Sequence, residues 1–335
     1  MTLVVTSYGV HLSKDGNCIV AQGKDGKRQY YSADKIEAVI LTEQCGLTTG
    51  VIQLCMEHDI PLVMQGGNGA PAWSVEAFSG GSAPVIRRRQ LELQHTQTGL
   101  MLAKELEAQK LENRSAFMRE LAWESGGAVR SMLLEAADMQ KRYSARILEL
   151  EGENVLSLRG SIQGIEGSAG RGYFTALSAL LPEQLGFCGR STRGASDPFN
   201  MLLNYGYGIL YQYVRKACVA ARLDPYIGIL HADQYNKPTL TYDLIEPFRH
   251  LAERAAYRLC SNSAAENLPD WTPSSEALPQ TCRQAMMQAL FTQLRRTVRR
   301  DSRRITNLEN ISTTARSIAK RIYAAPQEAV WKEAI

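Results

Sequence analysis

The pattern of apolar residues changes once along these 335 residues, between Gly80 and Pro84. Before this point, short apolar runs alternate with turn signals such as Lys14-Asp15-Gly16-Asn17, which is typical of β-strands and hairpins. After it, apolar residues recur at helical spacing almost throughout. The intervening glycines, serine and proline are typical of a linker. The predicted fold class is therefore α+β, with a small β-rich N-terminal domain at residues 1–80, a linker at 81–86 and a larger all-α domain at 87–335.

The helical part divides at its polar breaks. Asp197 followed by Pro198 indicates a helix start, because aspartate caps the first turn and a proline there has no hydrogen bond to lose. The polar residues 262–279, which include prolines, predict a loop. The helices expected are 87–123, 127–152, 156–182, 198–222, 244–260 and 282–323.

The bulk composition excludes several classes of protein. The formal net charge is only +4, and the seven cysteines are odd in number with no Cys-x-x-Cys pair. This argues against a disulfide framework and a zinc ribbon, and favours a reducing, cytoplasmic compartment. The N-terminus lacks the basic and long apolar stretches of a signal peptide. No run of about 18 apolar residues predicts a membrane span.

Three short segments each present one good metal-ligand side chain. Glu166 lies among glycines, His231 follows an apolar run, and Glu246 lies three residues after Asp243. A mixed set of carboxylate and imidazole ligands suits a divalent ion that handles phosphate, Mg²⁺ or Mn²⁺, better than a structural zinc. We expect Glu166, His231 and Glu246 to converge on one such ion, with Asp243 close to it.

Each of these segments also has a simpler interpretation. Asp243-x-x-Glu246 ahead of an apolar run is a capping box for a helix at 244–260. A lone histidine such as His231 is more often a hydrogen-bonded, half-buried residue than a ligand. The glycines around Glu166 do not form a phosphate loop, because no strand precedes them and no Gly-Lys-Ser/Thr follows. They favour a helix that a neighbouring element or a DNA backbone approaches closely, at a cost of about 1 kcal/mol per glycine.

Polar residues share one face of the helix expected at 198–222. Asn200, Asn204, Tyr207 and Tyr211 recur there at i, i+4, i+7 and i+11. One interpretation is that these side chains form a helix edge that hydrogen-bonds to loops. The other is that they lie behind the metal ligands and orient Glu166 or His231.

Arginines are clustered, although the chain as a whole is only weakly basic. Six of them fall between Arg295 and Arg304, and their spacing predicts one basic side of a helix that follows a nucleic-acid backbone. The alternative is a solvated face. The candidate DNA-binding arginines are Arg87, Arg88, Arg89, Arg171, Arg249, Arg295, Arg299 and Arg303.

The three segments together resemble the CRISPR-associated integrase of the adaptation module. The family shows a Glu-Gly segment followed by an aromatic pair, here Glu166-Gly167 and Tyr173-Phe174. A Gly-x-Leu-His segment and an Asp-Leu-x-Glu-x-Phe-Arg segment follow, here ending at His231 and Arg249. The resemblance implies that the helical domain is catalytic and that Glu166, His231 and Glu246 bind the ion. It also implies a homodimer formed through the N-terminal domain.

The resemblance further implies a partner and an activity. Two such dimers would flank a dimer of the small ferredoxin-like adaptation protein, which makes a heterohexamer. The expected function is metal-dependent insertion of short double-stranded DNA fragments, the spacers, into a CRISPR array. In it the 3′-hydroxyl of the protospacer attacks a phosphodiester at the edge of a repeat. The alternatives are a non-catalytic DNA-organising protein and a stand-alone metal-dependent nuclease.

Overall fold

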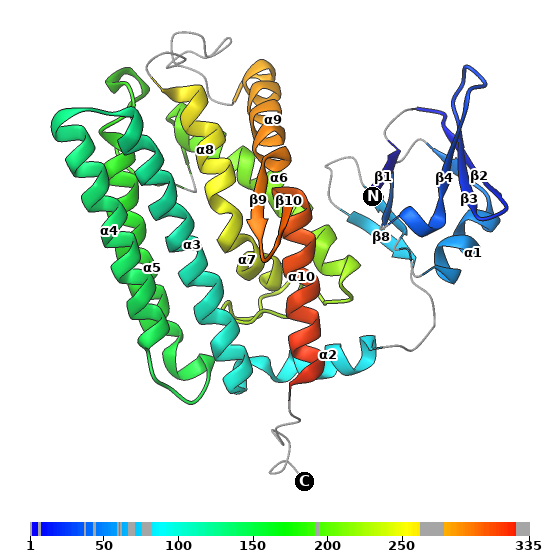
Figure 1. Ribbon diagram of the computed structural model, residues 1–335, viewed down its shortest axis with the longest axis horizontal. Coiled ribbons are helices and arrows are strands. Elements are labelled where there is room, and N and C mark those ends of the chain that lie inside the picture. The colour runs from blue at the N-terminus through cyan, green and yellow to red at the C-terminus, as the bar shows by residue number, and fades with distance from the viewer. Residues whose placement is uncertain are drawn as a thin grey trace. The chain divides into compact units, whose positions relative to one another are not determined.

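The computed structural model describes residues 2–5, 8–36, 38–42, 45–58, 60, 62–65, 71–75, 82–191, 194–261 and 278–325. Most of the loop predicted at 262–279 and the first linker residue, Gly81, lie outside the described residues. The chain divides into two compact units (Figure 1). Unit 1 is formed by residues 1–85 with 219–222, and unit 2 by residues 86–218 with 223–335.

Unit 1 contains two four-stranded sheets and one α-helix. In the first sheet, β1 (Thr2–Val5), β5 (Ala38–Thr42) and β7 (Leu62–Gln65) are parallel neighbours, and β8 (Pro71–Val75) pairs antiparallel with β7. The second sheet has the order β4 (Arg28–Ser32), β3 (Cys18–Gln22), β2 (His11–Asp15) and β6 (Gly46–Leu47). A short 3-10 helix, η1 (Ala33–Lys35), follows β4, and helix α1 spans Thr49–Glu57.

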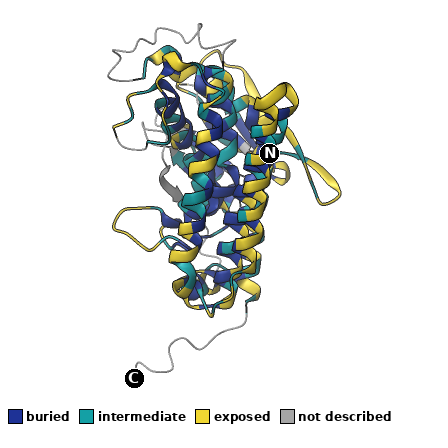
Figure 2. Ribbon diagram, turned by 90° about the vertical axis from the view of Figure 1, so that its left-hand side faces the viewer, coloured by how far each residue is buried: buried dark blue, intermediate teal, exposed yellow. Residues whose placement is uncertain are grey.

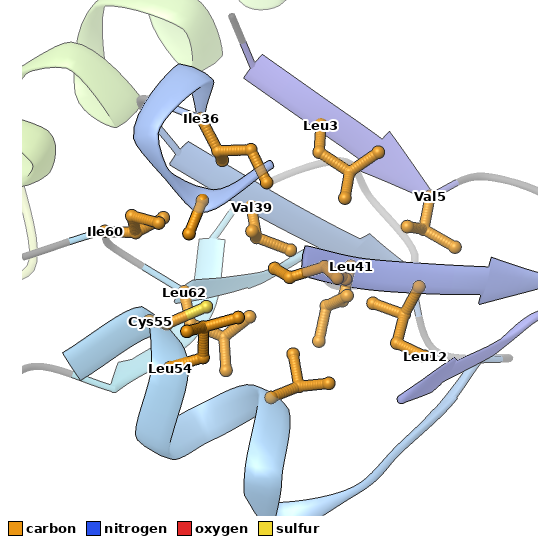
Figure 3. Close-up of a cluster of buried hydrophobic side chains, with 13 residues drawn as sticks. Leu3, Val5, Leu12, Ile36, Val39, Leu41, Leu54, Cys55, Ile60 and Leu62 are labelled. Atoms are coloured by element: carbon orange, nitrogen blue, oxygen red, sulfur yellow. The ribbon is translucent and has the colours of Figure 1, made fainter. Parts of the chain in front are cut away.

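Local sequence explains this small β unit. The turn signal near Gly16 forms the tight β2–β3 hairpin, in which Gly16 has φ 55°, a conformation that glycine adopts without strain. Alternating apolar residues of both sheets and α1 form one buried cluster (Figure 3). Leu12, Val39 and Leu62 in this cluster are fully buried. The strand-rich N-terminal region predicted from the sequence is confirmed.

Unit 2 is mainly helical. Its α-helices have buried residues along their inner faces and exposed residues outside (Figure 2). The first six are α2 (Ala83–Glu92), α3 (Gln97–Glu124), α4 (Gly127–Glu149), α5 (Val155–Ser178), α6 (Pro198–Ala220) and α7 (Thr239–Ile245). Three more follow, α8 (Arg249–Cys260), α9 (Gln280–Arg295) and α10 (Asn307–Ala324). Short 3-10 helices are η2 (Leu93–His95), η3 (Glu183–Leu185) and η4 (Glu246–Phe248).

The start of unit 2 differs from the single helix predicted at 87–123. Helix α2 begins at Ala83, inside the predicted linker, and the chain breaks at η2 before α3. Thr96 caps α3, since its hydroxyl accepts a hydrogen bond of 3.0 Å from the backbone N–H of Gly99. A Cβ on Gly99 would lie 1.7 Å from the carbonyl oxygen of Leu93, so the turn depends on a residue without a side chain.

The predicted helix at 282–323 was wrong in its middle. Between α9 and α10 the chain forms a β-hairpin of β9 (Thr297–Arg300) and β10 (Arg303–Thr306), so unit 2 is not entirely helical. Opposed β-branched residues, Val298 with Ile305 and Thr297 with Thr306, favour strand pairing. Thr306 also caps α10 in a capping box with Glu309. The arginine-rich segment therefore lies largely on a hairpin and not along one side of a helix.

Within the described part of the chain, no helix combines the length and the apolar character that crossing a membrane requires.

Candidate active site

A buried lysine lies at the centre of a carboxylate cluster. Lys110 Nζ is 2.6 Å from Glu166 Oε1, 2.5 Å from Glu246 Oε2 and 3.3 Å from Glu107 Oε2. The side chains of Lys110, Glu107 and Glu246 are each only 4% exposed, and that of Glu166 is 33% exposed. Two of the three predicted ligands, Glu166 and Glu246, are thus brought together around one point.

Different elements supply these side chains. Glu107 and Lys110 are one turn apart on α3, and Glu166 lies in the middle of α5. Glu246 opens η4, and the next carbonyl, that of Pro247, accepts hydrogen bonds from Asn113 Nδ2 at 2.7 Å and from His250 Nδ1 at 2.9 Å. These bonds fix the turn that carries Glu246.

The capping-box interpretation of Asp243 and Glu246 was wrong. Asp243 lies inside α7, which begins at Thr239 after Pro238, and α8 begins only at Arg249. The Asp243 carboxylate instead accepts the backbone N–H groups of Ile229, Leu230 and His231, at 2.5, 3.1 and 3.1 Å. It therefore holds the turn before His231 in place.

Asp243 also contacts the His231 ring. Its Oδ1 is 2.6 Å from His231 Nδ1, while the His231 side chain remains 34% exposed. Burial alone would lower the pKa of His231, but the hydrogen bond to Asp243 and the nearby negative charges raise it above its usual 6.5. With Nδ1 turned to the carboxylate, Nε2 is the ring nitrogen available to a ligand.

All three predicted ligands line one cavity of unit 2, with a volume of about 680 Å³. Its charged lining also includes Glu107 and the cations Lys110, Arg114, Arg171, Arg190 and Arg249. Five cations against three carboxylates give the lining a positive formal charge, without any charge on His231. The cavity therefore favours an anionic ligand.

Neighbouring charges set the protonation of the carboxylates. Burial would raise the pKa of Glu246, but Arg249 and Lys110 lower it to about 2. Burial raises the pKa of Glu107 to about 7, against the opposing effect of Lys110. Glu246 is therefore an ionised ligand candidate at neutral pH.

The donor set fits a hard divalent ion chemically, although Lys110 Nζ lies between Glu166 and Glu246. In the described ranges, no three His, Cys, Asp or Glu side chains are placed so that they could hold a metal as they stand. Glu246 Oε2, however, is buried, and its close contact is the Lys110 ammonium group, a cation in the position that a metal ion would take. Carboxylate oxygens with one imidazole nitrogen match Mg²⁺ or Mn²⁺.

Sequence reasoning missed a buried hub beside this cavity. Glu253, fully buried on α8, pairs with Arg114 at 2.6 Å and accepts the hydroxyl groups of Tyr173 and Tyr207, each at 2.8 Å. Arg114 Nη1 is buried and makes no hydrogen bond. The spacing of Glu107, Lys110 and Arg114 at i, i+3 and i+7 was the available signal, because these charges interrupt an otherwise apolar side of α3.

The polar face of α6 bonds to a loop and to residues around the cavity. The Asp197 cap predicted there is confirmed by its 2.8 Å bond from the Asn200 backbone N–H. Asn200 and Asn204 accept hydrogen bonds from Arg190, at 2.9 and 2.6 Å, and Tyr207 donates to Glu253. These three residues hold a loop and the hub. Tyr211, one turn further along, accepts a bond from Arg249, which pairs with Glu246 at 2.8 Å.

The candidate DNA-binding arginines fall into three places. Arg171 and Arg249 line the cavity. Arg87, Arg88 and Arg89 lie on α2, where Arg89 donates to the carbonyl groups of Ile322 and Tyr323 at the end of α10. Arg295, Arg299 and Arg303 are exposed, at the end of α9 and on the hairpin.

The fold resembles that of several solved structures. The chain superimposes on a casposase bound to an integration product with a TM-score of 0.71 and 20% identity, covering 98% of this chain and 96% of that chain. A partial Cas6-RT-Cas1–Cas2 complex gives a TM-score of 0.74 and 22% identity, covering 100% of this chain and 99% of that chain. At such identities the likeness shows the fold.

Sequence comparison identifies the family. The profile described as CRISPR associated protein Cas1 matches residues 3–292. The chain is 32% identical over 279 residues to the CRISPR-associated endonuclease Cas1 1 of Archaeoglobus fulgidus, an alignment that covers 78% of each chain. It is 27% identical over 275 residues to CRISPR-associated protein Cas1 3 of Methanobrevibacter ruminantium, which covers 80% of each. This chain belongs to the Cas1 family, and the predicted resemblance is confirmed.

Proposed function

We propose that this chain is a divalent-metal-dependent DNA integrase that inserts short duplex fragments into a CRISPR array. The observation that carries the proposal is the position of Glu166, His231 and Glu246 around one positively charged cavity in a Cas1-family chain. The Archaeoglobus fulgidus relative is named an endonuclease, and one structural neighbour is bound to an integration product. Both activities break or exchange a phosphodiester bond.

The residues of the cavity have separate roles in this proposal. Glu166, His231 and Glu246 would hold Mg²⁺ or Mn²⁺. When bound, the ion would orient the scissile phosphate and neutralise the negative charge that develops on it. Asp243 orients His231 through Nδ1, which leaves Nε2 available as the nitrogen that would hold the ion. The arginines of the lining, Arg171, Arg190 and Arg249, bind phosphate oxygens of the DNA, for which the guanidinium group is suited.

The reaction is transesterification. A protospacer 3′-hydroxyl forms a new ester bond with a phosphorus atom at the repeat edge, and the original 3′-oxygen of the repeat strand leaves and takes up a proton. The number of phosphodiester bonds is conserved, so no other energy source is needed. When water replaces the 3′-hydroxyl, the same site hydrolyses DNA, which is the nuclease alternative.

The proposed assembly is a homodimer formed through unit 1. Two such dimers would bind a dimer of the small ferredoxin-like adaptation protein to give a heterohexamer. One structural neighbour belongs to a partial Cas6-RT-Cas1–Cas2 complex, which supports a partner of this kind.

A strand-joining assay tests the proposal. The purified protein, with and without its small partner, is incubated with Mn²⁺, a labelled duplex and a supercoiled plasmid that carries the repeat. We expect branched joint products with wild type, and none with Glu246→Gln or with a duplex that ends in a 3′-deoxy nucleotide. Glu105→Gln is the matched control, because Glu105 lies on α3 but pairs with Arg321 outside the cavity.

The products distinguish the alternatives. Degraded DNA without branched products indicates a stand-alone nuclease. DNA binding without any chemistry, unaffected by chelator, indicates a DNA-organising protein. If Glu246→Gln joins DNA strands at the wild-type rate, Glu246 is not a ligand of the ion.

A further inference from the structure

Lys110 Nζ occupies the point on which the proposed ligand carboxylates converge. It lies 2.6 Å from an oxygen of Glu166 and 2.5 Å from an oxygen of Glu246. A divalent ion held by the same two oxygens would lie within contact distance of this ammonium group. Two cations repel each other strongly at such a distance in a buried site, so both cannot use these oxygens at once.

Glu107 offers Lys110 a second partner. It is one turn earlier on the same helix, its Oε2 is 3.3 Å from Nζ, and both side chains are only 4% exposed. Lys110 therefore keeps a buried counter-charge when its contacts with Glu166 and Glu246 are lost. The alternative, an unpaired buried ammonium group, would be costly.

Glu246 has a second partner that holds it in place without Lys110. Arg249 Nε makes a well-formed hydrogen bond of 2.8 Å to Glu246 Oε1, which fixes the carboxylate independently of Lys110. The other oxygen, Oε2, is the one that Lys110 contacts, at 2.5 Å. Removing Lys110 from Oε2 thus leaves the orientation of Glu246 in place.

We propose that Lys110 is a built-in competitor of the divalent ion. It holds Glu166 and Glu246 together before the ion binds, and it withdraws onto Glu107 as the ion takes its place. The proposal rests on the metal site of the proposed function. It assigns Glu107 a positioning role through Lys110, outside the ligand set.

The measurement is Mn²⁺ affinity, from the electron paramagnetic resonance signal of free Mn²⁺ titrated with the full-length protein after chelator treatment and dialysis. Lys110→Met should bind Mn²⁺ about tenfold more tightly or better, because the like charge at the site is gone. Glu107→Gln should bind it more weakly, because Lys110 then stays on Glu166 and Glu246. Lys104→Met is the matched control, since Lys104 on α3 donates to the Leu150 carbonyl outside the cavity.

The double variant Lys110→Met/Glu107→Gln separates a positioning role of Glu107 from direct ligation. If Glu107 acts only through Lys110, the Glu107→Gln change has no effect, within about twofold, in the Lys110→Met background. A loss of affinity in that background would make Glu107 a ligand and overturn its assigned role. Glu107→Gln retains Lys110, so it can be measured even if Lys110→Met fails to fold. Unchanged Mn²⁺ affinity in Glu107→Gln would then contradict the proposal.

If Lys110→Met has a native circular dichroism spectrum and binds Mn²⁺ no more tightly than wild type, Lys110 does not compete with the ion. Glu246→Gln distinguishes this from failure of the metal site itself. If Glu246→Gln abolishes Mn²⁺ binding while Lys110→Met does not strengthen it, only the competitor proposal fails. If Glu246→Gln binds Mn²⁺ like wild type, the metal site fails and the competitor proposal fails with it.

Discussion

Asp243 Oδ1 lies 2.6 Å from His231 Nδ1, and the same carboxylate accepts the backbone N–H of His231 at 3.1 Å. One side chain thus fixes both the backbone and the ring orientation of the histidine. Gly228, three residues earlier, permits the turn, because a Cβ there would lie 2.4 Å from the His231 carbonyl oxygen. The position of His231 is therefore determined by its neighbours and not by free rotation of its ring.

Replacing Asp243 by Asn should reduce strand joining about 10- to 100-fold, the usual effect of losing a group that orients a metal ligand. The amide keeps the shape but presents one acceptor oxygen in place of two. Asp233→Asn is the control, because Asp233 Oδ1 accepts the Gly228 N–H and the amide oxygen retains that function. Initial rates of branched-product formation measure both. Equal rates for wild type and Asp243→Asn would contradict the role of Asp243.

The raised pKa of His231 predicts how stability depends on pH. Its protonated form is favoured in the folded protein, so His231 adds stability below its unfolded pKa of about 6.5. This contribution is lost as the pH rises through the higher folded pKa. The melting-temperature difference between wild type and His231→Asn should thus be larger at pH 5.5 than at pH 8.5. In an Asp243→Asn background, this melting-temperature difference should no longer depend on pH. A difference that increases with pH would contradict the raised pKa of His231.

Much of the fold could be predicted because local pattern and tertiary structure agree. The tight turn at Gly16 and the Asp197 cap are such cases, since short-range chemistry fixes each one. The hairpin at 297–306 could not be predicted in the same way. Arginine favours helices, and the competing signal comes only from four β-branched residues whose pairing requires the turn at Asp301, with φ 54°.

The site could be predicted only in part. Glu166, His231 and Glu246 occur in recognisable segments, and the structure places them around one cavity. Glu253 and Lys110 lie in no recognisable segment, and the spacing of charges on α3 does not identify their partners, which are far away in sequence. Glu253 pairs with Arg114, 139 residues earlier, and Lys110 with Glu166, 56 residues later. Asp243 was mistaken for a cap because its partners, the N–H groups of residues 229–231, precede it in the chain.

Glu253→Gln should destabilise unit 2 by about 3–5 kcal/mol, the usual cost of breaking a buried ion pair and leaving one charge unpaired. The amide keeps the volume but leaves Arg114 without its counter-ion. Urea unfolding followed by circular dichroism gives the free energy of unfolding. Glu120→Gln removes a partly exposed partner of Arg254 and should cost about 1 kcal/mol or less. Similar losses for the two variants would show that the hub is not a major source of stability.

The glycines of α5 give a test that separates stability from DNA access. A Cβ on Gly164 would meet nothing within 4 Å, and one on Gly170 only Arg114 Nη1 and Glu166 Oε1, each at 3.9 Å. Both Gly→Ala variants should therefore raise the free energy of unfolding by about 1 kcal/mol. Of these two, Gly170 lines the cavity and Gly164 does not, so Gly170→Ala alone should slow strand joining. Wild-type joining by Gly170→Ala would show that DNA does not approach this helix face.

The arginine-rich β9–β10 hairpin places like charges opposite one another. Arg299 lies opposite Arg304, and Arg300 opposite Arg303, two cross-strand pairs of like charge. Such pairs are destabilising by themselves, and a bound phosphate backbone would relieve their repulsion. Arg299 and Arg303 are exposed, whereas Arg300 is held by Asn310 and Thr314 of α10. Arg304 is exposed as well, so Arg299 and Arg303 are two of the three hairpin arginines that can reach DNA.

Replacing both Arg299 and Arg303 by Gln should weaken DNA binding and reduce its salt dependence. Each lost phosphate contact lowers the slope of log K against log salt concentration by about 0.9 for duplex DNA. Fluorescence anisotropy at several salt concentrations measures this slope. The control is Arg119→Gln/Arg130→Gln, which removes the same charge at Arg119, paired with Asp138, and Arg130, stacked on Trp123. Because the control changes net charge equally, a slope that falls only in the hairpin variant assigns the contact to the hairpin, and equal slopes in both variants exclude it.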